Sequence, residues 1–140
     1  MVLDIMGIFM KQNYWTENTS ISLINYHFVW IVRRRRKALV GAIDERLKEL
    51  INQSVIELGC EVIAVETHLD HVHLFLQSNT LLAPYQIMHK VKGFTAFALR
   101  REFPELMRLP SMWTRSYFCG TAGAVSGDTI KRYVENQKTK

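Results

Sequence analysis

The sequence predicts an α+β fold, in which a split β-α-β antiparallel sheet carries helices on one face. Three observations support this. The segments read in the order strand, helix, strand, strand, helix, strand. Two of the central strand-like runs are short and close together, as in a hairpin. The composition of the 140 residues, 48% hydrophobic and 22% charged, is typical of one globular domain.

The first strand and helix are predicted from residue type and spacing. Residues 20–32 are rich in β-branched and aromatic side chains, which favours a strand. A basic run at 33–37 interrupts this pattern. Residues 40–58 repeat apolar side chains at intervals of three and four, which indicates an amphipathic helix ended by Gly59. The apolar positions are Ile43, Leu47, Leu50, Ile51 and Val55.

The rest of the chain completes the pattern. Residues 60–68 and 72–77 form two short strand-like runs, and a turn at Leu69-Asp70 makes them an antiparallel hairpin. The later elements are a helix over 84–103 with Pro84 in its first turn and Pro104 beyond its end, a strand at 116–119 and a last helix at 128–137.

Charge and cysteine content limit the class of protein. Lys and Arg number 18 against 13 Asp and Glu, and the net charge of +5 suggests a polyanionic partner. The composition excludes collagen-like, mucin-like and acidic-tail proteins. Cys60 and Cys119 form no C-x-x-C pair, which argues against a disulfide framework and favours a reducing cytosol.

The sequence shows no membrane segment, because no apolar run reaches the roughly 18 residues that a span requires. The apolar start of the chain contains Asp4 and has no basic region, so it is a poor signal peptide. We therefore expect a cytoplasmic protein with a single domain over 1–140. If translation begins at Met10, residues 1–9 are a non-essential extension.

The most informative motif is DHVHLFL, at residues 70–76. Side chains of a strand alternate, so His71 and His73 share one face while Val72 and Leu74 point to the other. Two adjacent imidazoles can converge on one cation, although a pair of half-exposed sheet histidines is the alternative. His68 is the obvious candidate for a third ligand, but it precedes the turn and the sequence leaves its position open.

A second candidate lies on the predicted terminal helix. Tyr133 and Gln137 are four residues apart and therefore share a helical face. Such a tyrosine can be a packing residue, or a nucleophile if positive charge lies near it. Lys131 and Arg132 precede it directly, after a glycine-containing segment.

Basic and aromatic residues offer a nucleic-acid surface. The run Arg33, Arg34, Arg35, Arg36 lies beside Trp30 and is either a solvated loop or a phosphate-contacting one. Lys92 belongs to a further group of cations on the second helix. Aromatic side chains at 113, 117 and 118 could stack on bases or pack in the core.

These motifs together resemble the single-tyrosine HUH transposases, which move insertion sequences as single-stranded DNA. The resemblance rests on four blocks that cover most of residues 26–137: NYHFVWIVRRRRKALVG, DHVHLFL, KGFTAFALRREFP and WTRSYFCGTAGAVSGDTIKRYVENQ. It implies an RRM-like, ferredoxin-like sheet with a C-terminal helix that carries the nucleophile. Two departures are Leu69, where the family often has proline, and a chain that stops three residues after Gln137.

The resemblance also implies the chemistry. His71, His73 and Gln137 would bind Mg²⁺ or Mn²⁺, and Tyr133 would form a 5′-phosphotyrosine link. Asp70 belongs to the turn or orients a histidine. The expected partners are single-stranded DNA with subterminal hairpins and a second copy of the chain, since members are homodimers whose active sites are shared between subunits.

Three other functions fit parts of the sequence. A non-catalytic RRM-like module would bind nucleic acid without forming covalent adducts. A phosphoesterase would use water in place of Tyr133. A domesticated relative of the transposases would process genomic repeats by the same chemistry.

Overall fold

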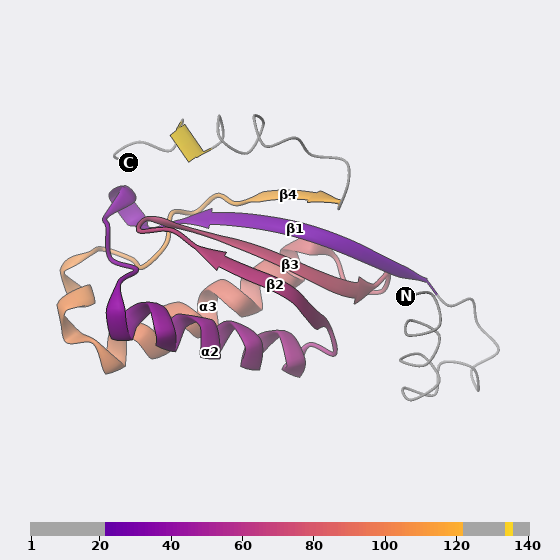
Figure 1. Ribbon diagram of the computed structural model, residues 1–140, viewed down its shortest axis with the longest axis horizontal. Helices are drawn as coiled ribbons and strands as arrows, with labels where there is room; N and C mark the ends of the chain where they lie inside the picture. Colours follow the sequence, from indigo (N-terminus) through magenta and orange to yellow (C-terminus); the bar gives the residue numbers. More distant parts are fainter. Residues whose placement is uncertain (1–21, 122–133, 136–140) are drawn as a thin grey trace.

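The structure, a computed structural model that describes residues 22–121 and 134–135, confirms the predicted α+β fold (Figure 1). Four antiparallel strands form one sheet in the order β2-β3-β1-β4. Their bounds are Leu23–Ile31 for β1, Glu61–Thr67 for β2, His71–Asn79 for β3 and Phe118–Thr121 for β4. The predicted hairpin is the β2–β3 pair, and the strand expected at 116–119 begins two residues later.

Two helices, α2 (Gly41–Glu57) and α3 (Pro84–Glu102), lie together below one face of the sheet in Figure 1. The end of α2 and the start of α3 lie at the glycine and the proline that the sequence analysis identified. Gly59 takes the left-handed conformation, with φ of +76°, directly after the last turn of α2. Pro84 opens α3, where the missing N–H costs no hydrogen bond. Short 3-10 helices follow β1 (η2, Arg33–Arg35) and α3 (η3, Pro104–Arg108).

The core lies between the sheet and these helices. In β3, Val72, Leu74 and Leu76 are fully buried and alternate with half-buried side chains. β1 contributes Phe28 and Trp30 to the same layer. A slip of one residue would move the apolar side chains of β3 out of the core, so burial fixes its register.

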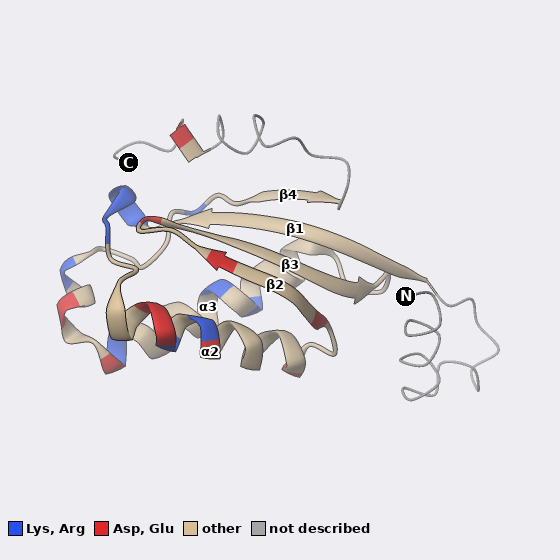
Figure 2. Cartoon of the chain, in the orientation of Figure 1, with Lys and Arg blue, Asp and Glu red and all other residues tan. Residues whose placement is uncertain are grey.

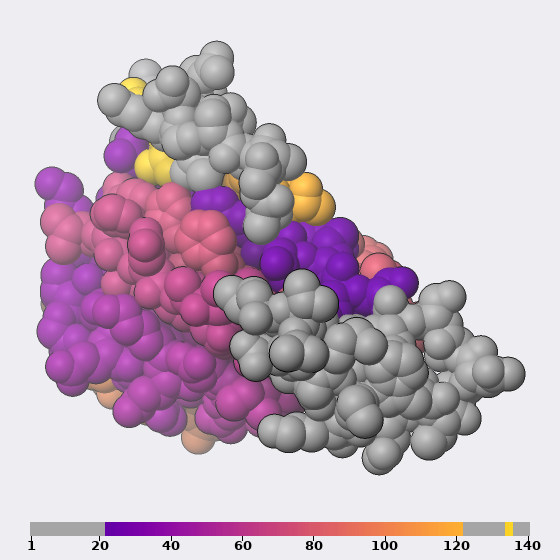
Figure 3. Space-filling model, turned by 45° about the vertical axis from the view of Figure 1, so that its right-hand side comes forward, coloured from indigo at the N-terminus to yellow at the C-terminus, as the bar shows by residue number. Residues whose placement is uncertain are grey.

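The opposite face of the sheet is also partly covered. Val29 and Ile31 point away from the helices, yet neither is exposed to solvent. Val134, which the structure places in a helical pair with Glu135, is 8% exposed. Figure 1 shows this pair, in yellow, on the side of the sheet away from α2 and α3, and its atoms are seen near the top of Figure 3.

Some expectations fall on residues that the structure does not describe. Apart from 134 and 135, the predicted terminal helix over 128–137 lies outside the described residues, and so do residues 1–9. Within the described part, no helix is long and apolar enough to cross a membrane.

Lys92 on α3 holds the segment that leads into β4. Its Nζ donates to the carbonyl oxygens of Thr114, Arg115 and Ser116, at 2.7, 3.3 and 3.0 Å. An ammonium group has three N–H donors, so these carbonyls use all of them. Burial lowers the pKa of Lys92 to about 8. This geometry favours an internal structural role, and DNA contact by Lys92 stays a prediction.

Replacing Lys92 by methionine should lower the free energy of unfolding by about 2 kcal/mol, because three carbonyls lose a charged donor while the side-chain volume is kept. Urea denaturation would measure the change. Lys90→Met is the matched control on the same helix, since the Lys90 ion pair with Glu57 is open to solvent. Equal stability of the two variants would contradict the structural role.

Candidate active site

His71 and His73 lie on the face of β3 that points away from the helices, as the alternation predicts. Strand pairing places other residues on this face. β1 runs beside β3 with Val29 opposite His73 and His27 opposite Phe75. The two histidines therefore lie near the middle of the sheet, at the end of β3 that follows the hairpin turn.

Asp70 holds the first histidine. Its Oδ1 accepts from His71 Nδ1 at 2.7 Å, and its Oδ2 accepts from Arg35 Nε at 3.0 Å. Burial alone would raise the pKa of Asp70, but the hydrogen bonds from His71 and Arg35 lower it below its ordinary value. Burial also lowers the pKa of His71, although Asp70 works in the opposite direction. A carboxylate bound to Nδ1 fixes the ring and leaves Nε2 available.

His27 holds the second histidine. Its Nε2 lies 3.1 Å from His73 Nδ1, within hydrogen-bond distance, and its ring stacks on Phe75 with centroids 4.0 Å apart. Burial and, to a smaller degree, the neighbouring His71, His27 and His68 together lower the pKa of His73 to about 4. His73 is therefore neutral at pH 7, which is the form that binds metals.

The hairpin turn before His71 is fixed by backbone hydrogen bonds. Val32 N–H donates to the carbonyl of Asp70 at 2.9 Å, and Leu39 N–H donates to that of Leu69 at 3.0 Å. His68 N–H closes the turn on the His71 carbonyl at 2.9 Å. Leu69, where the resemblance leads us to expect proline, is thus compatible with a well-formed turn.

The turn also brings His68 to the site. One ring nitrogen from each of His68, His71 and His73 lies within 4.8 Å of the others. Imidazole nitrogens are ligands for Mn²⁺, Co²⁺ and Zn²⁺, and the two strand histidines have their Nδ1 atoms engaged elsewhere. The donor set therefore fits a divalent cation.

The arginine run divides between internal contacts and solvent. Arg33 Nη1 donates to Ser111 Oγ at 3.4 Å, and Arg35 binds Asp70. Arg34 and Arg36 are exposed. Arg34 and Arg35 have positive φ angles of 60° and 52°, a backbone turn that lets neighbouring side chains diverge. Figure 2 shows this basic turn, in blue, at the end of the sheet.

The predicted aromatic residues have different positions. Trp113 is buried in the core, where its Nε1 donates to Thr95 Oγ1 at 3.1 Å. Tyr117 packs against Phe28, with centroids 6.2 Å apart. Only Phe118, of these three, lies beside the histidines, with its ring centroid 6.3 Å from that of His27.

Tyr133 and Gln137, the predicted nucleophile and third metal ligand, lie outside the described residues, so their roles stay predictions. Sequence reasoning missed His27. Its alternation with Phe28 and Trp30 could have placed it on the face away from the core, but only strand pairing brings it to His73.

Comparisons with known proteins agree on one family. The family model for IS200-like transposases matches residues 20–137. The ISDra2 transposase TnpA of Deinococcus radiodurans is 30% identical over 120 residues, which cover 84% of this chain and 86% of that protein.

Solved structures give the same result. A Deinococcus radiodurans protein described as a candidate transposase superposes with a TM-score of 0.81 at 26% identity, covering 86% of this chain and 95% of that one. A REP-associated tyrosine transposase bound to a REP hairpin shares the fold, with a TM-score of 0.51 at 13% identity over 80% of this chain and 62% of its own. Because the family model spans most of its length and a 30% identical relative aligns with more than four fifths of it, the chain belongs to the IS200-like, single-tyrosine transposases.

Proposed function

We propose that this transposase cleaves and rejoins single-stranded DNA at insertion-sequence ends, through a 5′-phosphotyrosine intermediate on Tyr133. The observation that carries the proposal is the pair His71 and His73, whose Nδ1 atoms are held by Asp70 and His27. Two oriented, neutral imidazoles on one sheet face are suited to a divalent cation.

His71 and His73 would hold the cation through their Nε2 atoms, together with Gln137 from the terminal segment. For His73 this requires the ring hydrogen on Nδ1, from which it donates to His27 Nε2. A bound Mg²⁺ or Mn²⁺ would supply Lewis-acid chemistry, by polarising the scissile phosphate and offsetting its negative charge. The nitrogen ligands favour Mn²⁺ more than a site made of oxygens would.

Tyr133 supplies the nucleophile. Its phenolic oxygen attacks phosphorus, the bond between phosphorus and the 3′ oxygen breaks, and the proton lost by the phenol is balanced by one gained at the 3′-OH. The phosphodiester is conserved in the tyrosine link, so a 3′-OH can later reverse the step. Val134, the next residue in the chain, is buried on the histidine side of its own sheet.

The DNA surface includes the exposed guanidinium groups of Arg34 and Arg36, which remain accessible to phosphates. Arg33 and Arg35 act by shaping the turn, through Ser111 and Asp70. The relative bound to a REP hairpin makes a hairpin-containing single strand the natural substrate to test. The free thiols of Cys60 and Cys119 agree with a cytoplasmic location.

The alternative functions predict different results in a DNA-cleavage assay. A non-catalytic module on the same sheet would bind DNA without an adduct, and a water-using phosphoesterase would cleave without Tyr133. The arrangement around His71 and His73 favours an enzyme, since a binding module needs no oriented pair of neutral imidazoles. A domesticated relative would show the same chemistry on genomic repeats.

The reaction is tested with single-stranded oligonucleotides copied from the DNA that flanks the gene. In Mn²⁺ or Mg²⁺ the wild type should form a covalent adduct on a denaturing gel, because Tyr133 becomes linked to the 5′ phosphate. Tyr133→Phe should form none and still bind DNA, and EDTA should abolish the adduct. Full cleavage by Tyr133→Phe would exclude tyrosine as the nucleophile.

The role of His27 is tested by His27→Phe, which keeps a ring to stack on Phe75 and removes the hydrogen bond to His73. Affinity for Mn²⁺ should fall about 10- to 100-fold, the usual effect of losing a group that orients a metal-binding histidine. Calorimetric titration would measure it. His89→Phe, at the exposed histidine of α3, is the control, and equal affinities would argue against the orienting role.

Sharing of active sites between subunits is tested by mixing two inactive variants, Tyr133→Phe and His73→Ala. If active sites are shared and the subunits pair at random, about half of the dimers are mixed, and one of the two sites in each mixed dimer has both functional groups. Activity should therefore return to about a quarter of the wild-type value. Adduct yield after co-refolding would measure it. If each subunit uses its own tyrosine, the mixture stays inactive.

A further inference from the structure

His68 lies beside the proposed metal ligands because of an irregularity in β2. The β2–β3 pairing shifts by one residue between Val62 and Ala64, where Ile63 is the extra residue of a bulge. After the shift Glu66 pairs with His73 and Thr67 with Val72. The next position along the hairpin sets His68 across from His71, on the same face of the sheet.

The contacts agree with this register. The His68 ring stacks on that of His71, with centroids 4.4 Å apart, and meets that of His73 edge-on at 5.4 Å. The three ligand nitrogens lie within 4.8 Å of one another. Two nitrogens bound to one ion at about 2.1 Å each are roughly 3–4 Å apart, so a modest rotation of the exposed His68 ring closes the difference.

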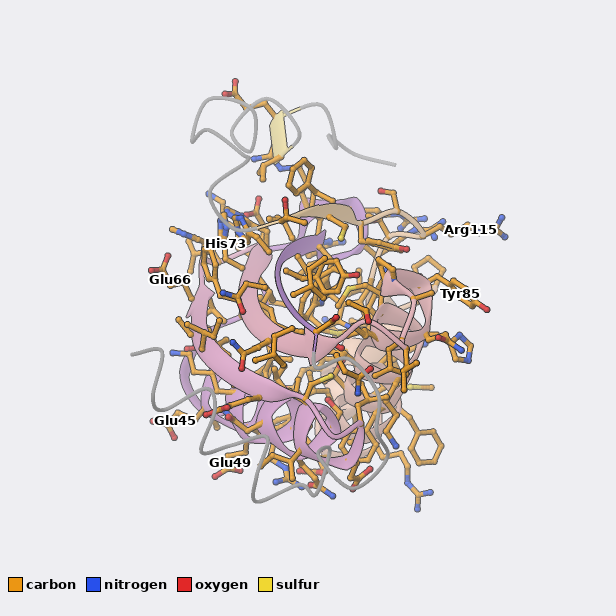
Figure 4. All side chains as sticks on the ribbon, turned by 90° about the vertical axis from the view of Figure 1, so that its right-hand side faces the viewer. Glu45, Glu49, Glu66, His73, Tyr85 and Arg115 are labelled. Carbon is orange, nitrogen blue, oxygen red and sulfur yellow. The ribbon has the colours of Figure 1, made fainter. Side chains whose placement is uncertain are left out.

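His68 also differs from its neighbours in its hydrogen bonds. His71 and His73 each use Nδ1 for a partner, Asp70 and His27 respectively. Within the described part of the chain, neither ring nitrogen of His68 makes a hydrogen bond, so both are available to an ion. Glu66, on the same face, extends outward from the sheet at the end where His73 lies (Figure 4) and is not part of the cluster.

We propose that His68 is an additional protein ligand, which makes the site a three-imidazole centre. The inference rests on the proposed function, since it concerns the same cation. Three nitrogen ligands bind later first-row ions such as Co²⁺ and Zn²⁺ much more strongly than Mg²⁺, whose preferred ligands are oxygens. His68 therefore sets metal selectivity in this chain, and the affinity for Co²⁺ depends on it more than the affinity for Mg²⁺ does.

The test is metal titration of the full-length protein, without DNA, using Co²⁺ and Mg²⁺ separately. Calorimetry would give affinities, and the visible spectrum of bound Co²⁺ would report the ligand set. For His68→Ala and His68→Gln we expect the Co²⁺ affinity to fall about tenfold or more, with a changed Co²⁺ spectrum and little change for Mg²⁺. His89→Ala, at an exposed histidine away from the cluster, should match the wild type.

A direct count of ligands completes the test. Pulsed electron paramagnetic resonance of bound Mn²⁺ should show coupling to three imidazole nitrogens in the wild type and two in His68→Ala. If His68 only stacks on His71, His68→Ala and His68→Gln will both bind Co²⁺ with wild-type affinity and spectrum, and this result would overturn the proposal.

Measuring His71→Ala as well shows whether a negative result refutes only the role of His68 or the metal site of the proposed function. Loss of binding in His71→Ala alone, with His68→Ala unchanged, keeps the two-histidine site and excludes His68. Unchanged Co²⁺ binding in both variants, or no binding by the wild type, would refute the metal site itself.

Discussion

The site depends on the strict alternation of side chains along β3. Val72, Leu74 and Leu76 are fully buried against the helices, so β3 cannot slip relative to its neighbours without exposing them. The same alternation forces His71 and His73 to the other face. The histidine spacing is therefore held by the hydrophobic core, and the stability of the fold and the geometry of the site have a common origin.

A second constraint is that the other face of the sheet is also shielded from solvent, so the polar groups on it are buried. Val29 and Ile31 are inaccessible to solvent, and His27 is 5% exposed. Burial lowers the pKa values of His27 and His73, so both rings stay neutral near pH 7. Because buried polar atoms need partners, the hydrogen bond between these two rings also stabilises their orientation.

Local patterns predicted the four strands, the two long helices and the face on which His71 and His73 lie, because alternation along one strand needs no knowledge of pairing. The role of His27 depends on which strand lies next to β3, which is a non-local property. The position of His68 depends on the bulge at Ile63, and no residue type in GCEVIAVETH marks a bulge clearly. Lys92 illustrates the same limit, since its three carbonyl partners lie 22 to 24 residues later in the sequence.

The basic turn reconciles two opposite electrostatic requirements. A divalent cation is repelled by nearby positive charge, whereas DNA phosphates are attracted to it. Arg35 is paired with Asp70, whose other oxygen binds His71. Arg34 and Arg36 point to solvent, where water and salt screen their charge from the site. The left-handed backbone at Arg34 and Arg35 thus separates a neutralised arginine from exposed ones over a few residues. Under the proposed function, this one short segment would serve both the cation and the polyanion.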